Sequence, residues 1–78
     1  MTEAYVAEAP LLLTVNEAAR LCNTSERTWR TWDTLGHVPR PVVVGRSKFW
    51  RPAEIRAWVA QGCPDRQTWD AVTEGKTF

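Results

Sequence analysis

The first pattern along the chain is a run of small apolar residues that recur at helical spacing between positions 15 and 22. Thr14 is followed three residues later by Glu17. This is the spacing of a capping box, in which each side chain satisfies a free backbone N–H at the start of a helix. These features predict a short helix from Val15 to about Cys22. Asn23 follows, and because asparagine enters the left-handed backbone region at low cost, a turn is expected there.

The next stretch, SERTWRTWDTL, carries two different stripes at helical spacing. Trp29 and Trp32 fall on one side with Leu35 or the methyl group of Thr28, whereas arginines and threonines recur along another side. Ser25 is a favourable N-cap, and Gly36 is suited to end the helix in the left-handed conformation. We therefore predict a helix whose tryptophans face the core and whose arginine and threonine stripe faces outward. Two helices joined by so short a turn make a helix-turn-helix.

Beyond position 36 the pattern changes from helical to extended. The two prolines in HVPRPVVVG favour extended backbone, and PVVVG and SKFWR are short β-prone runs that GRS could join as a hairpin turn. Pro52 then stands at a favourable first helical position, and Ile55, Trp58 and Val59 form an apolar stripe before Gly62. The last segment, PDRQTWDAV, is predicted to form one or two helical turns with its tryptophan folded back on the body.

The predicted order is therefore helix, turn, helix, hairpin and helix, followed by a short helical tail. We expect a mainly α fold with a small β-hairpin. The chain has 78 residues, which suits one small domain, and five tryptophans, of which Trp32, Trp50 and Trp58 in particular should lie in the core. We divide the chain into a flexible N-terminal arm over 1–11, a folded domain over 12–62, and a C-terminal tail with a short helix over 63–78.

The net charge of +1 conceals an uneven distribution of charged residues. Positions 20 to 56 carry eight basic residues and three acidic ones, whereas the two ends together carry two basic residues and six acidic ones. A concentration of positive charge in the middle of the chain indicates an anionic partner. The alternative is an ordinary solvated surface of mixed charge.

Other chemistry in the sequence is sparse. Cys22 and Cys63 lack the paired spacing of a zinc site, so we expect buried thiols, no disulfide and no metal. The chain has one histidine, no glycine-rich phosphate loop and no evident set of nucleophile, base and acid, so neither enzymatic activity nor a cofactor is expected. No apolar run approaches the roughly 18–20 residues of a membrane span, and the start lacks a signal-peptide pattern. We expect a cytoplasmic protein that does not act at a membrane.

Four segments, in this order and spacing, resemble the small winged helix-turn-helix proteins of the MerR superfamily, in particular the excisionase and AlpA-like regulators of phages and mobile elements. They are LLTVNEAARLC, SERTWRTW, GHVPRPVVVG and KFWRPAEIRAWV, and they cover most of positions 12 to 59. In the pattern of these proteins a smaller aliphatic residue is expected where this sequence has Trp29. The tryptophan ring could therefore be buried or could line the DNA surface. The long dimerising helix and effector domain of full-length MerR sensors have no counterpart in this sequence, so no small-molecule ligand is expected.

The resemblance implies that the second helix enters the major groove of DNA and that the hairpin, called the wing, lies on the backbone or minor groove. Arginine can bond guanine O6 and N7 in pairs or clamp phosphate, and threonine offers a hydroxyl and a methyl group. The serine hydroxyl and the amides at the start of the second helix could hold a phosphate. The predicted DNA contacts are Ser25, Arg27, Thr28, Arg30, Thr31, Thr34, Arg40, Arg46, Ser47 and Lys48.

Two classes of function follow from this reading. The first is a sequence-specific double-stranded DNA-binding protein, acting as a recombination directionality factor (an excisionase) or as a transcriptional regulator. Such a protein would sit in several copies on adjacent sites, with an integrase or recombinase as a further partner. The second is a protein interaction module that docks an integrase or polymerase through Trp69 and the acidic ends. In that case Arg30 could simply pair with Glu26 or Asp33 along the helix, worth about 0.2–0.5 kcal/mol, and the wing cations could serve solubility.

Overall fold

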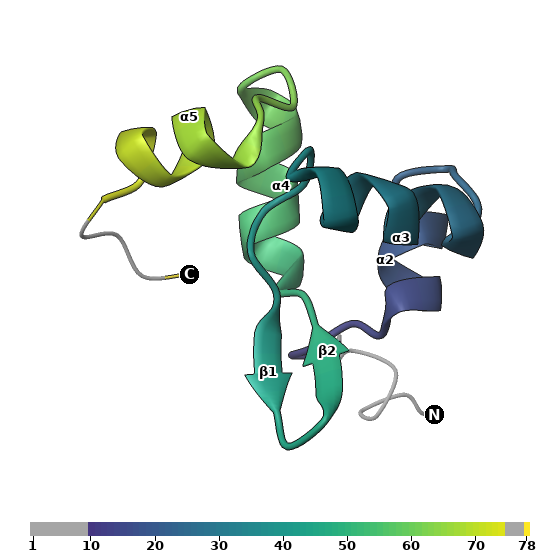
Figure 1. The fold of residues 1–78 in the computed structure, drawn as a ribbon. Helices are drawn as coiled ribbons and strands as arrows, with labels where there is room; N and C mark the ends of the chain where they lie inside the picture. The colour runs from purple at the N-terminus through teal and green to yellow at the C-terminus, as the bar shows by residue number, and fades with distance from the viewer. Residues whose placement is uncertain (1–9, 75–77) are drawn as a thin grey trace, which may run out of the picture.

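The computed structural model describes residues 10–74 and residue 78, so most of the predicted N-terminal arm, residues 1–9, and residues 75–77 of the tail lie outside the described part. Within it the chain forms four helices and a two-stranded antiparallel hairpin (Figure 1). With the labels of Figure 1 they are α2 (Val15–Leu21), α3 (Glu26–Leu35), β1 (Val42–Val44), β2 (Ser47–Phe49), α4 (Pro52–Ala60) and α5 (Arg66–Val72). The predicted order of elements is confirmed, including the short helix in the tail.

Local hydrogen bonds explain where α2 and α3 begin and end. The capping box is complete: the Thr14 hydroxyl accepts from the Glu17 amide at 3.2 Å, and the Glu17 carboxylate accepts from the Thr14 amide at 2.9 Å. Helix α2 ends one residue before the predicted position, and Asn23 takes the expected left-handed conformation with φ of 58°. Gly36 ends α3 in the same region, with φ of 76°.

The hairpin is built on a two-residue turn. Val42 pairs with Phe49 and Val44 with Ser47, so only Gly45 and Arg46 lie between the strands. The predicted three-residue turn GRS is therefore one residue too long, because Ser47 already belongs to β2. Just beyond β2, Trp50 forms a backbone bridge with Leu13, the residue that precedes the α2 cap. This bridge fastens the base of the hairpin to the start of α2 while its tip projects from the helical body (Figure 1).

The centre of the core is Trp29, which is completely buried. Its ring centroid lies 5.6 Å from that of Trp50 and 6.2 Å from that of Trp58, and both pairs meet edge to face, a favourable geometry for aromatic rings. The ring of Trp32 lies 6.1 Å away but is only half-buried. Of the two positions expected for the Trp29 ring, the structure has the buried one: the ring belongs to the core and not to the exposed surface of α3.

Two residues predicted to face the core are exposed instead. Leu35 is 61% exposed, although it continues the three-residue spacing of the tryptophans. At about 100° of rotation per residue, each step of three turns the stripe by about 60°, so Leu35 points roughly 120° away from Trp29. Val59 is 49% exposed although it lies only about 40° around α4 from Ile55, because the core covers the side of Ile55 that faces Trp58 and not the opposite side. Its neighbours Ile55 and Trp58 are buried as predicted.

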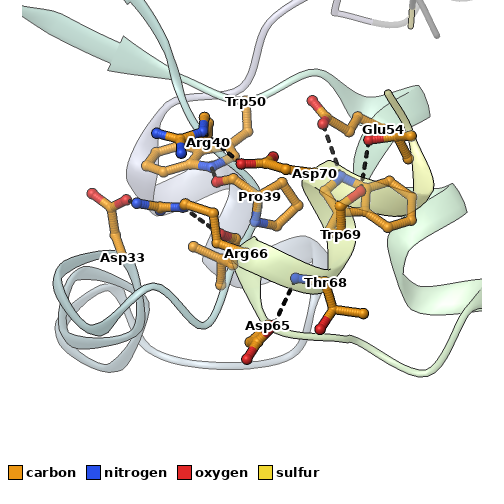
Figure 2. A network of polar contacts seen from close by, with 12 residues as sticks. Asp33, Pro39, Arg40, Trp50, Glu54, Asp65, Arg66, Thr68, Trp69 and Asp70 are labelled. Atoms are coloured by element: carbon orange, nitrogen blue, oxygen red, sulfur yellow. Dashed lines mark hydrogen bonds and ion pairs between the residues drawn. The ribbon is translucent and has the colours of Figure 1, made fainter. Parts of the chain in front are cut away.

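The C-terminal helix α5 packs onto the same core through Trp69. This tryptophan is buried, and its indole N–H donates to the Glu54 carboxylate on α4 at 3.0 Å (Figure 2). The Arg66 amide donates to the Gly36 carbonyl at 2.8 Å, and the Arg66 guanidinium donates to the Val38 carbonyl at 3.1 Å. The tail helix therefore holds both α4 and the chain segment that leaves α3. None of the helices in residues 10–74 is both long and apolar enough to cross a membrane.

Candidate nucleic-acid interface

A groove of about 690 Å³ runs between α3 and the hairpin. The start of α2 closes it on a third side through Thr14, Val15 and Asn16. The bridge between Leu13 and Trp50 ties the base of the hairpin to the start of α2, so it joins two of these sides. Predicted contact residues supply both long walls, and those that line the groove are Arg30, Thr34, Arg46, Ser47 and Lys48.

Two carboxylates also line the groove, and each pairs with one of its cations. Arg30 binds Glu26 one turn earlier in α3, with the closest atoms 2.6 Å apart. Lys48 reaches from β2 to Asp33 on α3, with its Nζ 3.0 Å from the Asp33 Oδ2. The groove is therefore a surface of paired charges with a small excess of cations, which comes from Arg46 at the tip of the hairpin.

Asp33 is a residue of the groove whose long-range contacts could not be found by sequence reasoning. Its carboxylate is only 10% exposed and binds Lys48 through one oxygen. The other oxygen accepts from Arg66 of α5 at 2.7 Å, and both of these residues are labelled in Figure 2. The sequence suggested a pairing with Arg30 along the helix, but that arginine turns to Glu26 instead. The true partners lie 15 and 33 residues away, so no local spacing could reveal them. One carboxylate thus joins the hairpin, α3 and the C-terminal helix.

The serine and threonine hydroxyls of α3 are already engaged within the helix. Ser25 accepts from the Thr28 amide at 3.1 Å and donates its own proton to the Thr28 hydroxyl at 2.9 Å, so it acts as the N-cap. Thr31 and Thr34 donate to the backbone carbonyls four residues earlier, Arg27 and Arg30. Each exposed threonine therefore presents a methyl group and the lone pairs of its oxygen, which suits a thymine methyl or a base amino group.

The remaining predicted contacts differ in their environment. Arg27 on α3 and Arg46 on the turn are exposed, and neither forms an ion pair with another residue in the described ranges. Arg40 does not join the groove. It binds Asp70 of α5 at 2.7 Å and lines a separate hollow beside that helix (Figure 2). The structure thus gathers the contacts on α3 and the hairpin and leaves Arg40 apart.

Hydrogen bonds lower the pKa of two exposed carboxyl groups. For Glu26 the main cause is the bond from Arg30, followed by one from Asn16. For Asp65, which caps α5, the cause is the bond from the Thr68 amide together with the Thr68 side chain. In both groups these bonds favour the charged carboxylate over the protonated acid.

The two cysteines are free and differ in exposure. Cys22 is half-buried against the core, and burial raises the pKa of its thiol, with a smaller contribution from Cys63. Cys63 is exposed, which contradicts the expectation of two buried thiols, because it lies in the turn between α4 and α5. In the described part of the chain no three histidine, cysteine or acidic side chains gather as a metal-binding set.

A scan against protein-family models, a search of curated proteins and a search of solved structures gave no match for this chain.

Proposed function

We propose that this protein is a winged helix-turn-helix protein that binds double-stranded DNA, with α3 in the major groove and the β1–β2 hairpin as the wing. The observation that carries the proposal is the groove between α3 and the hairpin, because predicted contact residues stand on both of its long walls. The major groove of B-DNA is about 12 Å wide and admits one α-helix. A helix inserted there leaves the neighbouring sugar-phosphate backbone beside it, in the position that the protein groove would accept.

The charges support a division of labour among these residues. Arg46 stands at the projecting turn and has no ion pair in the described ranges, so it suits a phosphate contact. Lys48 can meet phosphate as well, since its side chain is half-exposed while Asp33 holds it. On α3, Arg27, Thr31 and Thr34 are exposed and suit contacts inside the major groove.

Within this proposal the protein acts as an excisionase or a transcriptional regulator, and both roles use the same DNA-binding surface. One helix offers only a few side chains for base contacts, and each mismatched pair costs about 1–3 kcal/mol, so a single copy would select its site poorly. We therefore propose several copies on adjacent sites, with an integrase or recombinase as a further partner. The proposed place of action is the cytoplasm, where a phage or mobile-element regulator meets its DNA.

The alternative, a protein interaction module, depended on two features: an accessible Trp69 and the acidic ends of the chain. It relied on Trp69 as a docking residue, but Trp69 is buried and its indole N–H is bonded to Glu54. A partner would have to displace α5 from the core to reach this ring. Of the two features, the acidic residues of the chain ends alone still favour a protein interaction module.

Salt-dependent binding tests the proposal. Labelled duplexes selected from a random library are titrated with protein between about 50 and 200 mM salt, using wild type and Arg46→Ala. We expect a steep salt dependence for wild type and a slope reduced by about 1 in Arg46→Ala, since one phosphate contact is lost. Arg56→Ala is the matched control, because Arg56 is exposed on α4 and outside the groove. Equal slopes in all three proteins, or no binding by wild type, would contradict the proposal.

A further inference from the structure

The ion pair between Glu26 and Arg30 leaves one edge of the arginine free. The Glu26 Oε2 accepts from Arg30 Nε at 3.1 Å and from Arg30 Nη2 at 2.6 Å. A guanidinium offers two edges with paired donors, one formed by Nε and one amino nitrogen, the other by the two amino nitrogens. Glu26 takes the first edge. The second edge carries two parallel N–H donors and belongs to a side chain that is 63% exposed.

The carboxylate of Glu26 is itself fixed from a different element. Asn16 on α2 donates from its side-chain amide to the other oxygen, Oε1, at 3.3 Å. A pair one turn apart on a helix is weak and changes its geometry readily, but here the acid is held on both sides. The chain of bonds from Asn16 through Glu26 to Arg30 crosses the turn between the two helices and forms one wall of the groove. The direction of the free guanidinium edge is therefore set by the helix-turn-helix as a unit.

The charge of Glu26 also decides what Arg30 can bind. With the carboxylate beside it the pair has no net charge, and an approaching phosphate would meet a second anion within a few ångströms. A base edge carries no net charge and meets no such repulsion. Arg27 and Arg46 have no acidic partner in the described ranges, and Arg46 at the projecting turn suits phosphate. Arg30 is thus set apart from the other exposed arginines of this surface.

We propose that Glu26 is a positioning residue that presents the free edge of Arg30 to a guanine, so that the target DNA carries a G·C pair opposite Arg30. The two parallel donors match the O6 and N7 acceptors of guanine in the major groove, whereas adenine and the pyrimidines lack this pair of acceptors. This inference rests on the proposed function, because it requires α3 to enter the major groove.

The experiment selects a randomised duplex library with wild-type protein and then replaces each selected guanine in turn by 7-deazaguanine, which lacks the N7 acceptor. For one guanine we expect wild type to lose affinity by about tenfold, within the range for a paired arginine contact. Arg30→Ala should bind the normal duplex more weakly and show no further loss with 7-deazaguanine at that position. This result would assign the guanine to Arg30.

Glu26→Ala separates positioning from a merely structural role. We expect its preference for guanine at that position to fall about tenfold, while the salt slope rises by about 1 because the freed Arg30 now meets phosphate. Glu74→Ala is the control: it removes the same charge from an exposed site in the tail and should change neither quantity. Asn16→Ala, which leaves α3 intact, should weaken the guanine preference in the same direction. If a thermal melt shows that Glu26→Ala is unstable, the guanine preference of Asn16→Ala tests the positioning role of Glu26 in its place.

The outcomes distinguish this inference from the proposed function. If wild type selects no duplex from the library, DNA binding itself fails. If wild type selects a site but no guanine in it depends on Arg30, the guanine assignment is wrong while DNA binding stands. If Glu26→Ala and Asn16→Ala keep the full guanine preference and the wild-type salt slope, Arg30 contacts guanine without help and Glu26 has no positioning role.

Discussion

Replacing Asp33 by asparagine should destabilise the fold far more than its place on a solvent-facing helix suggests. The carboxylate is 10% exposed and holds Arg66, itself only 21% exposed, at 2.7 Å. A hydrogen bond between charged groups contributes about 1.5–3 kcal/mol, and the more exposed contact with Lys48 adds about 0.2–1 kcal/mol. Asparagine keeps the shape and one acceptor, so we expect a net loss of about 2 kcal/mol. For a chain of this size that lowers Tm by roughly 8–16 °C.

The assay is equilibrium unfolding in urea, followed by tryptophan fluorescence, together with a thermal melt. The matched control is Asp70→Asn, which breaks the ion pair with Arg40 at the same 2.7 Å distance but at a more exposed site. That substitution should cost less than about 1 kcal/mol. If Asp33→Asn costs no more than Asp70→Asn, Asp33 does not join the wing, α3 and α5 in the way described.

Three further predictions follow from the core, the thiols and the caps. Trp29→Phe should lower the free energy of unfolding in urea by about 1–3 kcal/mol less than Trp50→Phe does. The reason is that Trp29 Nε1 has no hydrogen-bond partner in the described residues, whereas Trp50 Nε1 donates to the Pro39 carbonyl at 2.8 Å; equal losses would contradict this. Iodoacetamide should alkylate Cys63 well before Cys22 at neutral pH, since Cys63 is exposed while burial raises the pKa of the Cys22 thiol. Peptide mass spectrometry measures both rates, and faster modification of Cys22 would refute the burial of its thiol. The stabilisation from the Asp65 cap should be complete above about pH 5 and decline as the pH falls through the lowered pKa of Asp65 in the folded state. Between pH 7 and pH 3 the Tm should therefore drop less in Asp65→Asn than in wild type. Parallel curves of Tm against pH would count against the cap.

Elements marked by local chemistry were predictable from the sequence. The capping box at Thr14, the left-handed turn at Asn23 and the glycine that ends α3 each depend on residues within a few positions, and all three are confirmed. The error at Leu35 arose because a stripe of spacing three drifts around a helix, so its last member leaves the buried face. Val59 keeps helical spacing from Ile55, and its exposure depends on how α4 packs in the fold and not on the local pattern.

The candidate site was only partly predictable, because its polar contacts link distant parts of the chain. The spacing of Glu26 and Arg30 suggested their pair, and the structure has it. The contact from Lys48 to Asp33 depends on where the hairpin packs, and the contact from Arg66 depends on α5 folding back over α3. Arg40 looked like part of the basic surface, but its position beside α5 follows from the path of the extended segment and not from its own residue type.

The most direct test of the central claim is an NMR titration of ¹⁵N-labelled protein with a duplex selected from a random library, at about 0.15 M salt. We expect the largest shift changes on the amides of α3 from Glu26 to Leu35 and on the hairpin from Gly45 to Lys48. We expect small changes on the outer surface of α4 and along α5. Changes confined to α4 and α5, or none with any duplex, would contradict the claim that α3 and the wing form a DNA-binding surface.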